Sequence, residues 1–238
     1  MGKKAWTIAK VNFRALNVLV FLAFTTFAAL FISNLISFLV MSGAAGHGSD
    51  ISPINALWLL PVMAGIALPA YNFRRIINLG GKREDFFWGC LVTYVILAAV
   101  VSLIVTISNF TIEPLLERHE YYDPSFLGGI VNLTEVFGWA NNGFIAGFFQ
   151  QFALLFLFSV FVHVFTAAQG KWYGWVAAVG VIAIISVFTP IAPLRRSLVW
   201  FFNLILFHDN ALVQILACLV IGAGVYLISR PVLARKTP

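Results

Sequence analysis

The sequence predicts an all-α membrane protein whose chain crosses the bilayer six times. Of its 238 residues, 61% are hydrophobic and only 10% are charged, whereas an ordinary soluble domain has roughly 25% charged residues. The apolar residues also occur in long runs, and a helix of about 20 apolar residues can cross the hydrocarbon core. Cys90 and Cys218 both lie inside apolar runs, so they provide neither a disulfide framework nor a metal-binding spacing.

Residues 1–14 are predicted to form an amphipathic helix before the first span. On a helical wheel Lys3, Lys10 and Arg14 share one face. A helix of this kind lies in the headgroup layer of the membrane, where each basic residue near an anionic surface contributes about 1 kcal/mol of binding. We therefore expect the opposite, apolar face to contact lipid. That face consists of Ala5, Trp6, Ile8, Ala9 and Phe13.

Six apolar runs are long enough to cross a membrane as helices. The first exceeds the necessary length and should tilt, and Pro61 and Pro69 should kink the second. Residues 190–209 lie between the fifth and sixth runs. Their apolar part is too short to cross, which predicts a half-buried re-entrant or interfacial hairpin. The six runs are residues 15–41, 53–70, 86–108, 142–168, 172–189 and 210–229.

Basic residues lie mostly on one side of this topology. With the N-terminus in the cytoplasm, only Arg118, Arg195 and Arg196 of the 15 lysine and arginine residues fall outside. Such an imbalance marks the cytoplasmic side of membrane proteins. Residues 111–141 then form an acidic extracytoplasmic loop. We predict a multi-pass protein of a bacterial cell (cytoplasmic) membrane with both termini inside, its basic charge facing the lipid bilayer and no nucleic acid.

Residues 71–89 are the only internal stretch in which charged residues are dense. Gly80 and Gly81 should separate two short helices, residues 73–79 and 82–88, because glycine leaves helical geometry at low steric cost. The second helix should run into the next span. A bent, basic loop of this kind is suited to docking a soluble partner. The alternative is a loop that only fixes the orientation of the protein, and the charges alone do not decide between the two.

Sequence motifs for catalysis are absent. Gly80-Gly81-Lys82 is no nucleotide-binding loop, because the P-loop pattern requires glycine at the position of Ile76 and serine or threonine at the position of Arg83. The sequence contains neither HExxH nor GxSxG, the motifs of common zinc and serine hydrolases. We therefore expect no catalytic, cofactor or metal site in this chain.

Polar and aromatic side chains inside the predicted spans are the candidates for a substrate path. An ionisable residue within a span, such as His163, is a functional hypothesis by default. The alternative is a neutral imidazole that bonds a neighbouring helix, and amides can likewise join helices without lining a path. The candidates are Asn34, Gln150, Gln151, Phe152, Ser159 and His163.

The predicted architecture resembles that of ABC-2-type (ABCG-like) ABC transporter permeases. The resemblance covers the whole chain as a single permease domain, and its most specific sequence is the turn that reads LGGKREDFF from Leu79 to Phe87. It implies that residues 1–14 are the connecting helix, that residues 71–89 dock on an ATPase, and that residues 190–209 cap the exit. The long acidic loop departs from the compact family pattern. The implied ATPase-coupling residues are Arg74, Arg75, Ile76, Ile77, Leu79, Lys82, Arg83 and Glu84.

The family resemblance also implies a function and partners. It implies an exporter that moves an amphiphilic peptide, drug or lipid-like molecule by alternating access, with each chain forming half of the permease. The partners would be a second permease subunit, identical or different, and a separate ABC ATPase that binds ATP and Mg. Two other functions stay open: the substrate-capture component of a vitamin importer, and a membrane enzyme centred on His163.

Overall fold

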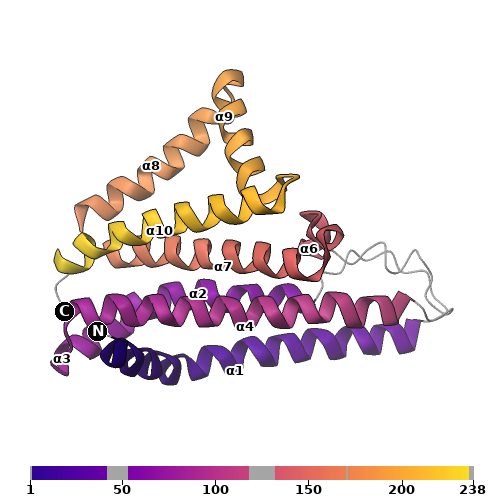
Figure 1. Ribbon diagram of the computed structural model, residues 1–238, viewed down its shortest axis with the longest axis horizontal. Helices are drawn as coiled ribbons and strands as arrows, with labels where there is room; N and C mark the ends of the chain where they lie inside the picture. Colours follow the sequence, from indigo (N-terminus) through magenta and orange to yellow (C-terminus); the bar gives the residue numbers. More distant parts are fainter. Residues whose placement is uncertain (1, 42–52, 118–131, 170, 236–238) are drawn as a thin grey trace.

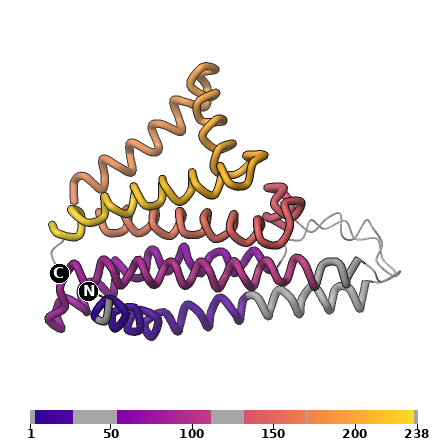
Figure 2. Tube along the Cα trace, in the orientation of Figure 1, coloured from indigo at the N-terminus to yellow at the C-terminus, as the bar shows by residue number. Residues whose placement is uncertain are grey.

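The chain folds into an elongated bundle of helices (Figure 1). The computed structural model describes residues 2–41, 53–117, 132–169 and 171–235, and no strand occurs among them. Side chains are described for residues 4–26, 54–111, 132–169 and 171–235, the coloured parts of the trace in Figure 2.

The helices follow one another along the chain with short 3-10 and π segments between them. The α-helices are α1 (Gly2–Met41), α2 (Leu59–Ala67), α3 (Phe73–Asn78), α4 (Arg83–Glu117), α6 (Leu133–Val136), α7 (Gly143–Ala168), α8 (Trp172–Phe188), α9 (Ala192–Phe202) and α10 (Ala211–Arg235). The 3-10 segments are η1 (Pro53–Trp58) and η3 (Trp139–Asn142), and the π segments are η2 (Leu68–Asn72) and η4 (Asn203–Phe207).

Five helical stretches in the described part of the chain are long and apolar enough to cross a membrane. The pair formed by α8 and α9 with η4 makes a sixth if it counts as one span. This finding confirms the prediction of a polytopic, all-α membrane protein. The five stretches are Lys4–Thr26, Ile54–Asn78, Arg83–Thr111, Trp139–Ala168 and Ala211–Arg235.

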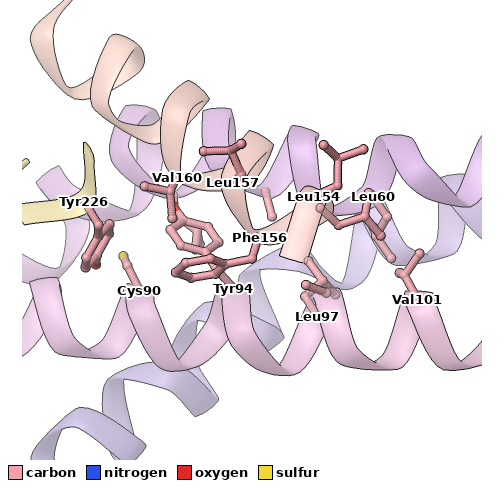
Figure 3. Packing of buried hydrophobic residues seen from close by; sticks show 14 of the residues in the cluster. Leu60, Cys90, Tyr94, Leu97, Val101, Leu154, Phe156, Leu157, Val160 and Tyr226 are labelled. Carbon is pink, nitrogen blue, oxygen red and sulfur yellow. The ribbon is translucent and has the colours of Figure 1, made fainter. Parts of the chain in front are cut away.

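Helix α7 is the centre of the bundle, because it packs against α2, α4 and α10. Helix α1 packs against the outer side of α4. The core between α4 and α7 is built from a stripe on α4 that recurs every three or four residues, as expected for one face of a helix (Figure 3). The stripe consists of Cys90, Tyr94, Leu97 and Val101, all buried.

The N-terminal segment was predicted to form a helix separate from the first span. It is instead part of the same helix. Helix α1 is continuous from Gly2 to Met41, although its direction changes near its N-terminal end (Figure 1). Ala5 and Ala9, expected to face lipid, are buried. The reason is close packing on α4: a Cβ atom on Gly89 would lie 2.5 Å from Cγ2 of Ile8, and small residues four apart permit such an approach.

The second span extends further than predicted. It continues through η2 and α3 to Asn78, so the helix predicted for residues 73–79 is present as α3 and is joined directly to the span. The kink expected at Pro69 takes the form of a π segment, in which the Phe73 amide donates to the Leu68 carbonyl. Single π turns inside helices accommodate such irregularities without breaking the helix.

The fifth predicted span and the hairpin after it form one bent arm. Helix α8 has 17 residues and no buried side chain, and the helix axis bends by 117° between α8 and α9. Together the two helices have the length and composition of one candidate span, so residues 172–189 and the predicted hairpin form a single bent unit. The chain bends at Pro190, and Pro193 occupies the first turn of α9, where its missing amide hydrogen is tolerated. Figure 1 shows the arm standing away from α7 and α10.

The N-terminal end of α1 and the C-terminal end of α10, which are the described chain ends, lie at the same end of the bundle as α3 (Figure 1). This is the end at which the turn between α3 and α4 is located. Most of the predicted extracytoplasmic loop, residues 118–131, and the predicted loop 42–52 lie outside the described residues. The side of the membrane on which each end lies stays a prediction from the basic residues.

Candidate functional site

The turn between α3 and α4 is built on two glycines. Gly80 has φ of 83°, a left-handed conformation that favours glycine. The amides of Gly80 and Gly81 donate to the carbonyls of Ile77 and Ile76 at 3.0 and 2.9 Å, which closes the end of α3. A Cβ atom on Gly81 would lie 2.6 Å from Cγ2 of Ile76, so this position has no room for a larger residue. The break predicted at the glycines is therefore present.

The chain after the turn follows the prediction that residues 82–88 are helical and run into the next span. Helix α4 begins at Arg83 and continues without a break to Glu117. Glu84 and Asp85 lie in the first turn of α4, where negative charge interacts favourably with the helix dipole. A 35-residue helix therefore starts directly at the turn.

The eight predicted coupling residues do not share one environment. Ile76 is buried in the core of this chain, so its side chain cannot fill a groove on a partner as the prediction required. Ile77 is half-buried, and Leu79 is 78% exposed. The other exposed members are Arg74, Arg75, Lys82, Arg83 and Glu84. The turn thus presents a basic surface with one protruding leucine.

Two of these exposed residues contact α10. The Arg83 guanidinium donates to the Ala234 carbonyl oxygen, and Arg230 Nη2 lies 3.4 Å from Glu84 Oε1. Deeper in the bundle, the Tyr226 hydroxyl donates to the Phe87 carbonyl oxygen. We call these three contacts the α4–α10 clasp. They join residues about 140 positions apart or more and were not predicted from the sequence.

A buried asparagine joins three elements close to the same end. Asn12 Nδ2 donates to Thr93 Oγ1 at 3.3 Å and lies 3.8 Å from Cys90 Sγ. Asn12 Oδ1 accepts from Asn72 Nδ2 at 3.3 Å. Asn12 therefore links α1, η2 and α4. Asn12 was not among the residues predicted from the sequence, although an asparagine on the packed face of a membrane helix is typical of an interhelical bond.

His163 is fully buried between α4, α7 and α10. Its Nδ1 atom lies 2.7 Å from the Tyr94 hydroxyl, within hydrogen-bonding distance. The centroid of its ring lies 5.6 Å from that of Tyr226, the residue that also bonds Phe87 in the clasp. This geometry is that of an imidazole bonded to a neighbouring helix, the second of the two roles considered for it.

The glutamines of α7 bond other helices as well. Gln150 accepts a bond from Asn142 at 3.1 Å and donates to Gln214, which in turn donates to the Ile205 carbonyl at 2.9 Å. This amide chain connects η3, α7, α10 and η4. Gln151 accepts from Thr106 on α4 at 3.4 Å. Both glutamines are buried, so neither lines an open path in this conformation.

The remaining path candidates have different surroundings. The Ser159 hydroxyl donates to the Leu155 carbonyl oxygen at 2.7 Å. A Cβ atom on Gly65 would lie 2.5 Å from the Ser159 carbonyl oxygen, so α2 and α7 cross closely at this point. Phe152 is half-buried and stacks between Phe148 and Phe156 with centroids 6.4 Å apart. The side chain of Asn34 is outside the described residues. Among the described candidates, Phe152 alone reaches the surface.

An aromatic cluster that the sequence analysis did not identify closes the opposite end of the bundle. Trp58 and Trp139 stack with centroids 6.0 Å apart, and Phe137 lies between Trp139 and Phe207 at 4.9 and 5.5 Å. Trp139 Nε1 donates to the Leu206 carbonyl at 3.1 Å. The cluster gathers η1, η3 and η4, which come from three distant parts of the chain.

Buried asparagines connect the same end of the bundle. Asn109 Nδ2 donates to Thr134 at 2.7 Å, and Asn132 Nδ2 donates to Asn109 Oδ1 at 3.3 Å. The Leu133 amide donates to Asn55 at 3.3 Å. These bonds join α4, α6 and η1. Asn109 and Asn132 are both buried.

Among the described residues, no group of three or more histidine, cysteine, aspartate or glutamate side chains is placed to hold a metal ion. No protein-family model, curated protein or solved structure matches the chain.

Proposed function

We propose that this chain is the membrane-spanning permease subunit of an ATP-binding-cassette exporter. The observation that carries the proposal is the exposed basic turn between α3 and α4 at the end of the bundle where both chain ends lie. Arg74 and Arg75 lie on the exposed side of α3, and Leu79 projects beside them. A protruding apolar side chain surrounded by charges suits a contact with a soluble subunit.

The turn is connected firmly enough to transmit a displacement. The α4–α10 clasp ties the start of α4 to α10, and Asn12 ties α4 to η2 and α1. Movement of the turn by a partner would therefore shift several spans together. Interfaces and packed cores respond to such shifts by rigid-body motion, which is how alternating access proceeds.

An amphiphilic substrate agrees with the surface of α7. Phe152 lies in an aromatic ladder with Phe148 and Phe156, and Phe149 beside it is exposed. Aromatic side chains offer apolar area to a ligand without demanding a fixed polar pattern. The substrate of the exporter would be a peptide, drug or lipid-like molecule that reaches this surface from the bilayer.

The test of the proposal is the recovery of an ATPase with the permease. A tagged chain purified from its native membranes should bring with it a subunit containing the P-loop pattern GxxxxGK[ST], and the reconstituted complex should hydrolyse ATP. The double variant Arg74→Glu/Arg75→Glu should lose at least about 30-fold in ATPase affinity, since removing one partner of a desolvated charge pair costs roughly 2 to 5 kcal/mol. Arg195→Glu/Arg196→Glu, with the same charge change on α9, is the control.

Two results would contradict the proposal. The first is purification of the chain without any nucleotide-binding subunit. The second is undiminished ATPase binding and transport by Arg74→Glu/Arg75→Glu, which would leave the turn as an orientation signal. If the chain were instead the substrate-capture component of an importer, it would bind a small molecule tightly and show no export activity. Binding of small molecules to the purified chain tests this alternative.

A further inference from the structure

The turn between α3 and α4 is too small to hold a soluble subunit alone. Within residues 71–89, ten residues are exposed, whereas a stable protein interface uses about 20 to 30 residues on each side. Exposed surface beside the turn must therefore contribute to any stable docking. A neighbouring element can contribute only if its position relative to the turn is fixed.

The α4–α10 clasp fixes the C-terminal end of α10 beside the turn. Arg83, the first residue of α4, donates to the carbonyl of Ala234, and Glu84 lies 3.4 Å from Arg230. Arg235 follows Ala234 directly, is exposed, and is the last residue of α10. Its backbone therefore lies close to the start of α4 and to the exposed basic residues of the turn.

The length of α10 places this end outside the hydrocarbon core. Its 25 residues span about 38 Å, and the core is only about 30 Å thick. Because Arg230 and Arg235 both lie at its C-terminal end, and charged side chains are costly inside the bilayer, the excess length extends on that side. The C-terminal turns of α10 thus project at the same level as the turn.

We propose that the C-terminal end of α10, through Arg235, is a second part of the surface that docks the nucleotide-binding subunit. This inference rests on the proposed function. Arg83, Glu84 and Arg230 are engaged within the clasp, which leaves basic groups on α3 and on the end of α10 to meet the partner. The partner surface then carries acidic groups at two separate places, one opposite each.

Site-directed photo-cross-linking in intact membranes tests this inference. A benzophenone amino acid is placed singly at Leu79, at Arg235 and, as a control on α9, at Arg196, all exposed positions. Adducts are identified by mass spectrometry. The expected result is an adduct with a chain containing GxxxxGK[ST] at Leu79 and at Arg235, and none at Arg196.

The outcomes separate this inference from the proposed function. An ATPase adduct at Leu79 with none at Arg235, or with only lipid or another protein there, overturns the second docking point and leaves the exporter in place. No ATPase adduct at either position contradicts the exporter, and the inference with it. Each variant is compared at equal amounts of membrane-inserted chain.

A binding measurement provides a second readout that does not depend on cross-linking yield. Arg235→Glu should weaken binding of the purified nucleotide-binding subunit by about fivefold, as expected for reversal of one exposed interface charge. Arg196→Glu, the same substitution on α9, should leave binding unchanged. Equal affinity of the Arg235→Glu and wild-type chains would overturn the inference.

Discussion

Polar side chains within this bundle mostly bond neighbouring helices. His163, Asn12 and Gln150 each bond a residue on another element, and all three are buried. In a membrane, a buried polar group has no water to bond, so a partner on another helix contributes directly to the packing. The path candidates were recognisable from the sequence because polar residues are rare in apolar runs. Their partners were not, because pairing depends on which helices become neighbours.

The first prediction concerns the bond between His163 and Tyr94. His163→Leu should lower the free energy of unfolding by about 1 to 3 kcal/mol, because it leaves the buried Tyr94 hydroxyl without this partner. The double variant His163→Leu/Tyr94→Phe should be more stable than His163→Leu alone, since both polar groups are removed. Unfolding of the purified protein in detergent measures both.

The outcome also decides between the two roles of His163. His163→Gln, which keeps a donor and an acceptor, should retain most of the transport activity. If His163→Gln folds with wild-type stability and yet is inactive, the functional role of His163 is favoured over the interhelical bond.

The second prediction uses the tight crossing of α2 and α7. A Cβ atom on Gly65 would lie 2.5 Å from the Ser159 carbonyl oxygen, so Gly65→Ala must push the two helix backbones apart. Overpacking of this kind costs about 1 to 3 kcal/mol. Thermal unfolding should show this loss, with Gly224→Ala as the control, because a Cβ atom on Gly224 meets nothing within 4 Å. Equal stability of the two variants would contradict the described crossing.

At the scale of helices, the α4–α10 clasp combines contacts of unequal strength. The pair between Arg230 and Glu84 is well exposed, at 67% and 46% of their side chains, and such pairs contribute about 0 to 1 kcal/mol. The bond from Tyr226 to Phe87 is buried, and their rings stack with centroids 4.5 Å apart. Most of the stability of the clasp therefore resides in its buried part.

The third prediction follows from this inequality. Tyr226→Phe keeps the stacked ring but removes the hydroxyl, and it should lower the unfolding free energy by about 0.5 to 1.5 kcal/mol. Glu84→Gln should change it by less. Thermal unfolding of the two variants side by side measures the difference. A larger loss for Glu84→Gln would show that the exposed pair holds the helices together.

The elements of the fold were predictable to different degrees. The turn at Gly80 and Gly81 follows from local chemistry and is present as expected. The packing of the start of α1 was not predicted, because Ala5 and Ala9 have the pattern of lipid-facing residues in the sequence. Only the fold shows that this part of α1 packs against Gly89 of α4. The bent arm was missed for a related reason: residues 172–189 have the composition of a span, and only the described fold shows α8 without a buried side chain.

At the scale of the whole molecule, the basic residues and the shape of the fold agree. Arg74, Arg75, Arg230 and Arg235 lie at the end of the bundle where both chain ends are found. The grouping of these arginines on one side was predictable from the sequence, because the lysine and arginine residues of each loop can be counted without knowing how the helices pack. The contacts that hold the ends together, such as Arg83 to Ala234, require the three-dimensional arrangement.

The fourth prediction tests the orientation of the molecule. Asn78, the last residue of α3, and Asn141, within η3, are both exposed. In intact cells, Asn141→Cys should react with a membrane-impermeant thiol reagent and Asn78→Cys should not, whereas both should react after the cells are opened. Cys90 and Cys218 are buried and should contribute little background. Labelling of Asn78→Cys from outside would reverse the predicted orientation.

The position of the two chain ends has a consequence for protein engineering. The N-terminal end of α1 and the C-terminal end of α10 lie at the end of the bundle that carries the turn. A nucleotide-binding domain fused genetically to either of these two helix ends would therefore begin close to the proposed docking surface. A short flexible linker provides an effective concentration in the millimolar range. A weakly associating pair of subunits would thereby become a single polypeptide with obligatory one-to-one composition, and the fusion point could be chosen at either terminus.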